Sequence, residues 1–482
     1  MIPGPLEQRS GGAKDGGEPR SGRRPAPAKP LRVSARWVLP VSGEPIAHGA
    51  VLVGADGRIA AVGPEASVPR PARRDEVSLG RAALLPGLVN AHSHLELTAL
   101  RGLVRDVPFF DWIRTVRAIK YGVDRVIYRA SARWGVLESF AAGITTSGDT
   151  GNTLQAATAM AELGARGVAY HEIFGPDPKQ RATAMAGLEE ALTKLKHVAS
   201  DRVTIGVSPH APYTVSDELL RAATALAARR RLKTATHTAE SEEERALVEQ
   251  GCGPFADDLR SRGIAVEPRG TTTIGWLERA GFLALKPLLI HCVTAGPDDL
   301  ARAGRAGATT VHCPWSNAAL GHGRADFAAM RRLGLAVGIG TDSVVAGGGH
   351  DLFTAARQAA FGLPAGRGLS ARELLRLLTA DGAAALGLED VGTLTVGAWG
   401  DLTAVRLDTA ASAGPEAEAA AAWSATASDV VFTVVAGRVV YRSGRWPGVR
   451  IAEERKGFLA AASAAAAVSR AVPRPPRDPG PA

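Results

Sequence analysis

The sequence has little cysteine, few aromatic residues and no long apolar run. Three of its 482 residues are cysteines, at Cys252, Cys292 and Cys313. An odd number of widely spaced cysteines gives no disulfide framework and suits a reducing compartment, so we expect a cytoplasmic protein. No stretch approaches the ~18 apolar residues of a transmembrane helix, and the N-terminus has Pro, Gly and charged residues where a secretory signal needs an apolar core. We therefore expect no membrane partner.

Positive charge is in excess, but much of it lies at the two ends of the chain. The formal net charge is +9, from 57 Lys and Arg against 48 Asp and Glu. Residues 1–30 carry six basic and three acidic residues, and residues 453–482 carry five and three, so the ends supply +5 of the +9. A basic tail can contact nucleic acid or acidic lipid, but this pattern favours solvated tails. We expect no nucleic-acid partner.

Composition and turn residues mark out the flanks of the chain. Residues 1–30 are rich in Pro, Gly and Arg, and residues 451–482 are rich in Ala and Pro without an amphipathic repeat. We expect both to be disordered tails, with at most a frayed helix at 460–467.

Short β-type runs with turn signals occupy residues 31–85 and again 391–450. Because each segment is too small to be stable alone, we expect the two to pair in one discontinuous β-sandwich.

Between the flanks, residues 86–390 alternate β-type runs with helical patterns, which indicates parallel βα units. Helix starts are recognisable at Ser216, before an Ala and Leu run, and at the capping box of Ser370 and Glu373. Eight parallel strands, each followed by a helix, close into a TIM barrel. We predict an α/β fold in which a (β/α)8 barrel carries the small β-sandwich. The eight runs lie at 84–92, 143–149, 167–174, 203–210, 232–238, 287–292, 308–313 and 336–342.

Metal-ligand residue types stand at the ends of the predicted strands. The first run ends in His92 and His94, and residues two apart in a strand point to the same side. Later runs end at His237, His291 and Asp342. An isolated histidine is more often structural, but these residues all fall at the carboxyl end of the predicted barrel, where TIM-barrel active sites lie. Imidazoles and one carboxylate form the ligand set of a catalytic zinc-type site with a position open for water.

The residues themselves leave several roles open. Glu240, in the loop after His237, is placed to pass a proton from metal-activated water to a leaving group, although an acidic residue also favours a helix start. His291 can ligate the metal or hydrogen-bond the attacking water, and we favour the second role. Asp342 can be a ligand and proton acceptor or a helix cap. We expect His210 to face the substrate.

These motifs resemble the amidohydrolase superfamily over residues 31–450, in particular its cytosine, adenosine-homocysteine, guanine and triazine deaminase and chlorohydrolase branch. The resemblance implies that His92, His94, His237 and Asp342 bind the metal. It also implies that Glu240 and Asp342 transfer protons, that His291 polarises water or substrate, and that His210 contacts the substrate ring. The matching segments are 86–94, 143–146 with Asp149, 208–213, 237–240, 291–292, 313–317 and 340–343.

The fourth strand bears on the number of metals. Two-metal members of the superfamily need a bridging carboxylate there, usually a carbamylated Lys, and the run at 203–210 has no Lys. We therefore predict one divalent ion, zinc or alternatively iron, because the ligand set does not choose between them. Metal-bound hydroxide would attack a ring carbon that bears an amino group, and Glu240 would protonate the departing ammonia.

The predicted function is hydrolytic deamination of an aminated heterocycle, which is hydrolysis of a non-peptide C–N bond. Purine or aminofutalosine-like compounds, pterins, pyrimidines and triazines are the candidate substrates. The alternatives are amide or C–Cl hydrolysis by the same residues, or a scaffold protein that has lost its metal. Relatives are commonly oligomeric, so a homo-oligomer is a further expectation.

Two further residues are expected to contact the substrate. Trp112 lies in a segment that resembles the roof of the family's pocket, and Glu172 lies in a segment that resembles aminofutalosine-type members. Glu96 and Glu172 can bind substrate amines or belong to structural ion pairs. Many adenosine-type relatives carry a ribose-binding Glu shortly after that Trp, where this chain has Lys120, which argues against a simple nucleoside. Residues 251–275 suit a lid or a lateral insert, and no role is assigned to them.

Overall fold

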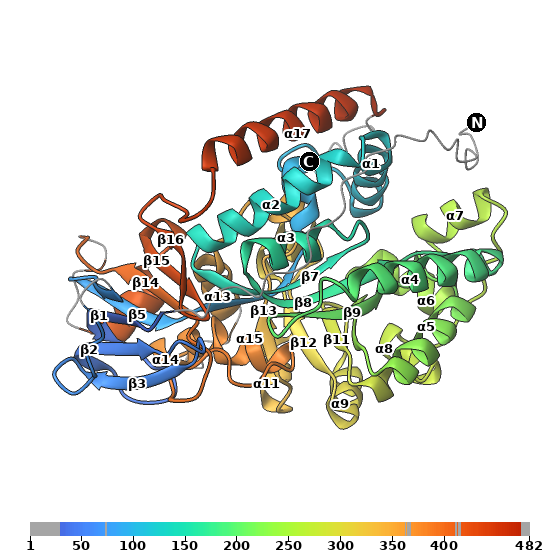
Figure 1. Cartoon of the computed structure of the whole chain (residues 1–482). Coiled ribbons are helices and arrows are strands. Elements are labelled where there is room, and N and C mark those ends of the chain that lie inside the picture. Colours follow the sequence, from blue (N-terminus) through green and yellow to red (C-terminus); the bar gives the residue numbers. More distant parts are fainter. Residues whose placement is uncertain are drawn as a thin grey trace, which may run out of the picture.

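Eight parallel strands surrounded by helices form the centre of the molecule, and a second sheet lies at one end of them (Figure 1). The structure is a computed structural model that describes residues 29–72, 75–361, 363, 368–409, 412 and 416–473. The predicted disorder of residues 1–28 and 474–482 falls outside the described residues.

The barrel strands lie at the eight predicted runs. They pair in parallel in the order β13 to β6 along one sheet. A bridge between Ser93 and Asp342 connects the two outer strands, and the Asp342 amide donates to the His92 carbonyl at 3.0 Å, so the barrel is nearly closed. The strands are β6 (Leu88–Ser93), β7 (Ile144–Gly151), β8 (Arg166–Ile173), β9 (Val203–Pro209), β10 (Lys233–Thr238), β11 (Leu288–His291), β12 (Thr309–His312) and β13 (Val337–Ile339).

Helices connect each strand to the next. The Ser216 hydroxyl accepts a hydrogen bond from the Leu219 amide at the start of α5, and Ser370 and Glu373 form the capping box of α14, as predicted. The outer helices are α2 (Val126–Ala141), α3 (Gln155–Leu163), α4 (Arg181–Leu195), α5 (Asp217–Arg230), α8 (Thr273–Arg279), α9 (Pro297–Ala306), α11 (Phe327–Arg332), α13 (Leu352–Phe361), α14 (Ala371–Leu377) and α15 (Ala380–Ala385). Further helices interrupt the segments that follow the strands: α1 (Phe109–Gly122), α6 (Glu242–Gln250), α7 (Pro254–Ser261), α10 (Pro314–Ala319) and α12 (Val344–Gly347).

The two flanks pair with each other, as predicted, in one mixed sheet of order β16-β15-β14-β5-β1-β2-β3, with β4 beside β1. β14 runs antiparallel to β5, with Leu402 opposite Pro86, and this pairing joins the flanks. Both flanks contribute to one apolar cluster, which contains Val33 and Val51 together with Phe432. The strands are β1 (Leu31–Val38), β2 (Ile46–Val53), β3 (Ile59–Pro64), β4 (Glu76–Ser78), β5 (Ala82–Pro86), β14 (Leu402–Arg406), β15 (Val430–Val435) and β16 (Arg438–Arg442).

The sheet and the barrel meet at a tightly packed junction. The predicted run 84–92 is divided at Gly87 between β5 of the flank sheet and β6 of the barrel. A Cβ at Gly87 would lie 2.2 Å from the Thr145 hydroxyl, so only glycine permits this approach. Nearby, Asp401 accepts a hydrogen bond from Arg166 Nε at 2.6 Å, and both side chains are buried. This ion pair ties the flank sheet to the first residue of β8.

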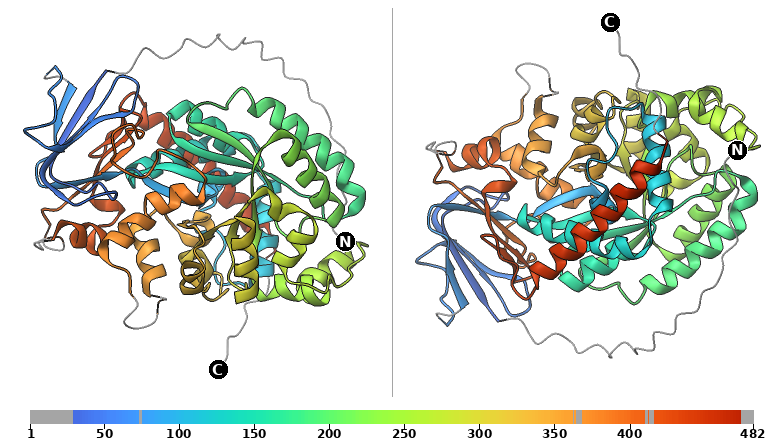
Figure 2. Two further views of the ribbon diagram at one scale, coloured as in Figure 1. Left: turned by 90° about the horizontal axis from the view of Figure 1, so that it is seen from below. Right: turned by 90° about the horizontal axis from the view of Figure 1, so that it is seen from above.

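The C-terminal segment differs from the expectation of a disordered tail. Residues 451–471 form one helix, α17 (Ile451–Ala471), which crosses the outer helices of the barrel (Figure 2). Ala461 and Ala465 are buried, and Phe458 stacks on Trp134 of α2 with ring centroids 5.1 Å apart. The predicted disorder is therefore wrong for this part. The small side chains of α17 pack closely against α2, which lies far away in the sequence.

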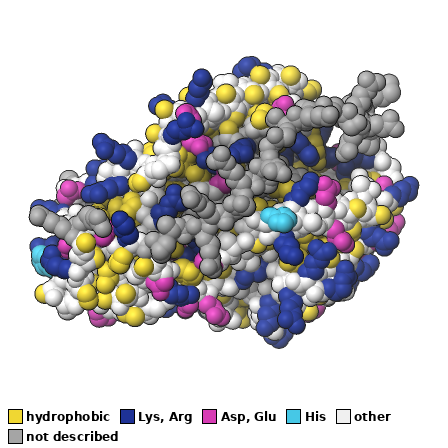
Figure 3. All heavy atoms as spheres, in the orientation of Figure 1, with side chains coloured by type: hydrophobic (Ala, Val, Ile, Leu, Met, Phe, Trp, Pro, Cys, Tyr) yellow, Lys and Arg dark blue, Asp and Glu magenta, His cyan; other side chains and the backbone are white. Residues whose placement is uncertain are grey.

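Basic side chains gather over α5 and α9, at the lower right of the face in Figure 3. Arg229 and Arg230 lie in the last turn of α5, and Arg305 lies in the last turn of α9. Positive charge at a helix C-terminus is stabilised by the helix dipole, which accounts for this placement. Among the residues that the structure describes, no helix has both the length and the apolar character needed to span a membrane.

Candidate active site

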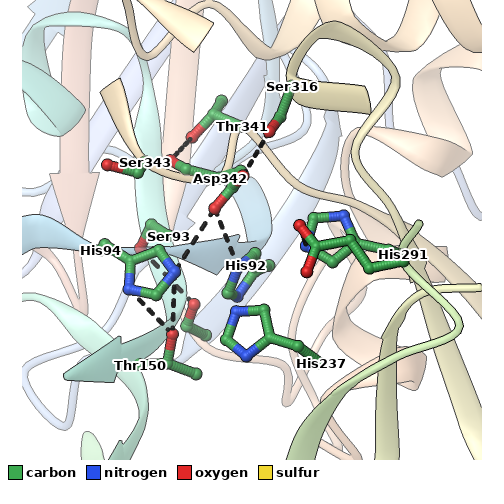
Figure 4. A network of polar contacts seen from close by, with 12 residues as sticks. His92, Ser93, His94, Thr150, His237, His291, Ser316, Thr341, Asp342 and Ser343 are labelled. Carbon is green, nitrogen blue, oxygen red and sulfur yellow. Dashed lines mark hydrogen bonds and ion pairs between the residues drawn. The ribbon is translucent and has the colours of Figure 1, made fainter. Parts of the chain in front are cut away.

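Three histidines and one aspartate meet at the carboxyl end of the barrel (Figure 4). His92 lies in β6, His94 directly follows it, His237 lies in β10, and Asp342 follows β13. The His92 ring centroid is 4.8 Å from that of His94 and 5.0 Å from that of His237. Asp342 Oδ1 lies 3.1 Å from His92 Nε2 and 3.4 Å from His94 Nε2. The structure thus brings together the four residues predicted to hold a metal.

The backbone turns sharply where these strands end. His291 has φ of +77° and Asp342 has φ of +57°, values that residues with a Cβ adopt rarely and at a cost. The hydrogen bond from the Asp342 amide to the His92 carbonyl holds one of these turns. Just after β6, the amide of Leu95 donates a hydrogen bond to Asp149 of β7 at 2.7 Å. These contacts aim the side chains into one space.

Burial and neighbouring charges set the protonation of the four groups. Burial lowers the pKa of His92 to about 4 and that of His237 well below its usual value, so both rings are neutral. At His94 burial also lowers the pKa, but the hydrogen bond to Asp342 and nearby carboxylates outweigh it and raise the pKa to about 9. Burial acts to raise the pKa of Asp342, yet hydrogen bonds to His92 and His94 hold it well below its usual range. A divalent cation would replace the proton that His94 and Asp342 share.

The donor set fits an ion of the zinc type. Three imidazole nitrogens, one each from His92, His94 and His237, lie within 4.8 Å of one another, and a carboxylate adjoins them. His237 Nδ1 lies 3.1 Å from the His210 carbonyl, an arrangement that fixes the ring and leaves Nε2 for a metal. Two further groups have the same spacing: His92, His291 and Asp342, which shares His92 with the first, and Glu172, His210 and His237, which shares His237.

Glu240 and His291 lie beside the ligand group. Glu240 Oε1 is 3.4 Å from His291 Nε2, and Glu240 Oε2 accepts a hydrogen bond from the Tyr213 hydroxyl at 3.3 Å. His291 Nδ1 lies 2.9 Å from Asn317 Oδ1. The acidic residue that serves the start of α6 is Glu244, whose carboxylate accepts a hydrogen bond from the Glu240 amide at 3.1 Å. The side chain of Glu240 is thus directed to the site and does not cap the helix.

One site residue, His322, was not indicated by any pattern in the sequence. It lies just beyond α10, and its Nε2 is 3.4 Å from Glu240 Oε1. Burial acts to raise the pKa of Glu240, but the charge of His291 and the hydrogen bond from His322 outweigh it and lower the pKa. His322 stands in a loop, away from any strand end, so strand periodicity carries no signal for it.

The site opens into a cavity of about 320 Å³. The three residues predicted to contact substrate, His210, Trp112 and Glu172, all line this cavity. Glu172 is buried, its Oε1 lies 3.9 Å from His210 Nε2, and this oxygen lacks a hydrogen-bond partner among the described residues. A buried acceptor without a partner in the protein is suited to a donor on a ligand.

The segment 251–275 contributes to the cavity wall through α7. Phe255 lines the cavity and stacks on Tyr213 with ring centroids 4.2 Å apart. The ring of Phe110 in α1 contacts the Phe255 ring edge-on, with centroids 5.3 Å apart. This segment is therefore an insert that supplies an aromatic wall.

Lys120 also lines the cavity, but its charge is paired. Its Nζ lies 3.1 Å from Glu96 Oε1, and Glu96 also accepts hydrogen bonds from the amides of Asn152 and Thr153 at 3.2 and 3.1 Å. Glu96 is thus satisfied within the protein, whereas Glu172 keeps an oxygen that is available to a substrate.

Comparison with known proteins identifies the family. A match to the Amidohydrolase family spans residues 83–440. The chain belongs to this family. It is 30% identical over 382 residues to the 5-methylthioadenosine/S-adenosylhomocysteine deaminase of Desulfitobacterium hafniense, covering 77% of this chain and 84% of that one. It is 33% identical over 279 residues to the aminodeoxyfutalosine deaminase of Deinococcus radiodurans, covering 55% of this chain and 65% of that one.

A solved structure shares the fold. An adenosine deaminase from Xanthomonas campestris, determined with bound zinc, has a TM-score of 0.79 and 24% identity, and the likeness covers 93% of this chain and 100% of that one.

The predicted resemblance and enzyme class are confirmed: this member of the amidohydrolase family is a deaminase that acts on C–N bonds other than peptide bonds. The alternative of a scaffold protein is not supported.

Proposed function

We propose that this amidohydrolase removes the 6-amino group of a purine nucleoside that carries a substituent on its sugar, using one divalent ion. The observation that carries the proposal is the position of Glu240, which contacts His291 and lines a cavity of about 320 Å³ together with His94, His237 and Asp342. A cavity of this size is in the usual range for small-molecule sites.

The four side chains are proposed to hold zinc, with iron as the alternative. The three nitrogens and one carboxylate are the ligands of catalytic zinc sites, and the solved adenosine deaminase contains zinc. A divalent cation held here supplies Lewis acidity, which makes water a nucleophile at neutral pH. The low pKa values of His92 and His237 keep their nitrogens free of competing protons.

Proton transfer is assigned to Asp342 and Glu240. Asp342 is a carboxylate at neutral pH and accepts one proton of the attacking water, which ends on the ring nitrogen of the product. Glu240 is also ionised, and it carries a proton from this water to the departing amine. His291 places its Nδ1 against Asn317 Oδ1 at 2.9 Å, which leaves Nε2 to form a hydrogen bond with the water.

The cavity favours a substituted nucleoside over a free base. Its lining includes Asp342 and Trp112, on which an aromatic ring can stack. It extends to Arg114 and Arg117, whose side chains are exposed at the rim. The relatives named above act on 5-methylthioadenosine, S-adenosylhomocysteine or aminodeoxyfutalosine, which are all larger than an aminated base.

Ammonia release from the purified protein tests this proposal. The panel contains 5′-methylthioadenosine, S-adenosylhomocysteine, aminodeoxyfutalosine, adenosine, guanine, cytosine and a chlorinated triazine. We expect ammonia from at least one of the three substituted nucleosides, with kcat/KM of about 10⁴ M⁻¹ s⁻¹ or more and a lower value for adenosine. Ammonia from guanine or cytosine alone, or chloride release from the triazine without any ammonia, would contradict the proposal.

A further inference from the structure

A short stretch after β12 contacts the two groups assigned to proton transfer and the histidine assigned to the attacking water. Two of its residues lie in α10, and the third lies just beyond that helix. The contacts are those of the Ser316 hydroxyl with Asp342, of Asn317 Oδ1 with His291, and of His322 with Glu240. The first two residues lie in a motif that the family resemblance already includes, whereas His322 lies outside it.

His322 is held in place by its surroundings. Its amide donates to the Asn317 carbonyl at 2.9 Å. Its ring meets Phe109 of α1 at an angle of 89° with centroids 4.4 Å apart. The side chain is 1% exposed, and Nε2 faces Glu240 Oε1 at 3.4 Å. A buried ring that packs against Phe109 presents its nitrogen to the carboxylate in one orientation.

Glu240 depends on few neighbours for its orientation. The Tyr213 hydroxyl donates to Oε2, and Oε1 faces both His291 and His322 at 3.4 Å. His291 is assigned to a hydrogen bond with the attacking water, so it is not free to serve Glu240 alone. His322 is buried behind the site and, among the described residues, is not one of those that line the cavity.

We propose that His322 is a positioning residue for Glu240. The ion-pair contact of Nε2 with Oε1, at 3.4 Å, holds the carboxylate in the rotamer that reaches both the attacking water and the departing amine. His322 touches neither the substrate nor the ligand group, so its effect passes through Glu240. This inference rests on the proposed deaminase function.

Two substitutions of similar polarity test the contact. In His322→Gln the side-chain amide nitrogen can reach the place of Nε2, whereas in His322→Asn it falls short. We expect H322N to lower kcat by roughly 10–100-fold with KM changed less than about 3-fold, because misplacing a proton-transfer group slows the reaction without weakening binding. We expect H322Q to keep most of the activity. The measurement is steady-state ammonia release with the best substrate of the panel.

A double substitution shows whether the effect passes through Glu240. In a Glu240→Gln background, H322N should cause no further loss, since the group that it positions is already disabled. His197→Asn, at an exposed position, is the matched control and should leave activity unchanged. Metal content and thermal melting are measured for each protein.

The outcomes separate the two proposals. Losses from H322N and E240Q that multiply, an equal loss in H322Q and H322N, or a rise in KM at unchanged kcat would each overturn the role of His322. A wild-type protein that releases no ammonia from any aminopurine rejects the proposed function itself. An active wild type in which H322N is fully active rejects only the inference about His322.

Discussion

Two buried carboxylates, Glu96 behind the cavity wall and Glu172 in it, differ in how far the protein satisfies them. Glu96 pairs with Lys120 and accepts backbone hydrogen bonds, so it has a structural role. Glu172 has an oxygen without a partner in the described part of the chain, and this oxygen lies beside His210 at the cavity. The same residue type thus serves packing at one position and is available for binding at the other.

Glu172→Gln is expected to weaken substrate binding more than it slows the reaction. The substitution replaces one carboxylate oxygen by an amide nitrogen that cannot accept a hydrogen bond, and leaving a buried donor without its partner costs about 1–3 kcal/mol, so KM should rise roughly 10-fold with kcat changed little. Steady-state kinetics of ammonia release measure this. Glu190→Gln, an exposed position in α4, is the control. An unchanged KM combined with a lower melting temperature would indicate a structural ion pair instead.

At single positions, the sequence predicted the residues that strand geometry controls. His92, His94 and His237 could be predicted because each stands at the end of a regular strand, where the register decides the direction of the side chain. His322 could not, because its contact with Glu240 depends on how an irregular loop folds back. The pairing of Lys120 with Glu96 is a long-range contact that local patterns do not report.

At the scale of elements, α17 shows that a segment of low complexity can be part of the folded structure. Ala461 and Ala465 face the outer helices of the barrel, while Ala464 is exposed. Helix propensity indicated at most a frayed helix, because the propensity of an alanine run does not reveal which helix it packs against. The strands were predicted more accurately, since short apolar β-type runs bounded by turn residues specify them locally. The division of one run at Gly87 was not visible, because it depends on the approach of β7.

Ala465→Asp is expected to release α17 from the barrel. A charge buried without a partner is strongly unfavourable, so the free energy of unfolding should fall by about 2 kcal/mol or more. Ala464→Asp, one residue away on the exposed side, should change it by less than about 0.5 kcal/mol. Thermal melting and limited proteolysis of the C-terminal segment compare the two variants. Equal behaviour of the two variants would show that the helix does not pack as described.

For the whole molecule, the buried ion pair of Arg166 and Asp401 joins the two sheets. Both side chains are nearly inaccessible, Arg166 Nε lies 2.6 Å from Asp401 Oδ2, and the guanidinium lies 4.3 Å from the centre of the Trp399 ring. Asp401 also accepts a hydrogen bond from the Ala436 amide at 2.7 Å. Arg166 begins β8, whereas the active site lies at the opposite ends of the strands. The pair therefore serves stability and not catalysis.

Asp401→Asn is expected to destabilise the protein without altering its chemistry. Removing one partner of a buried ion pair costs about 3–5 kcal/mol, because the other charge stays buried. Asp390→Asn breaks the exposed pair with Arg58, which is worth about 1 kcal/mol or less. Urea unfolding compares the two variants, and kcat is measured below the transition. A loss of kcat in D401N at unchanged stability would contradict this role.

The most direct test of the whole account is a zinc titration of the metal-free enzyme, followed by ammonia release. The account predicts no activity without metal, a linear rise with added zinc, and a plateau at one zinc ion per chain, with no rise in the variant His237→Ala. Ammonia release from metal-free protein, or a plateau only at two zinc ions per chain, would contradict it.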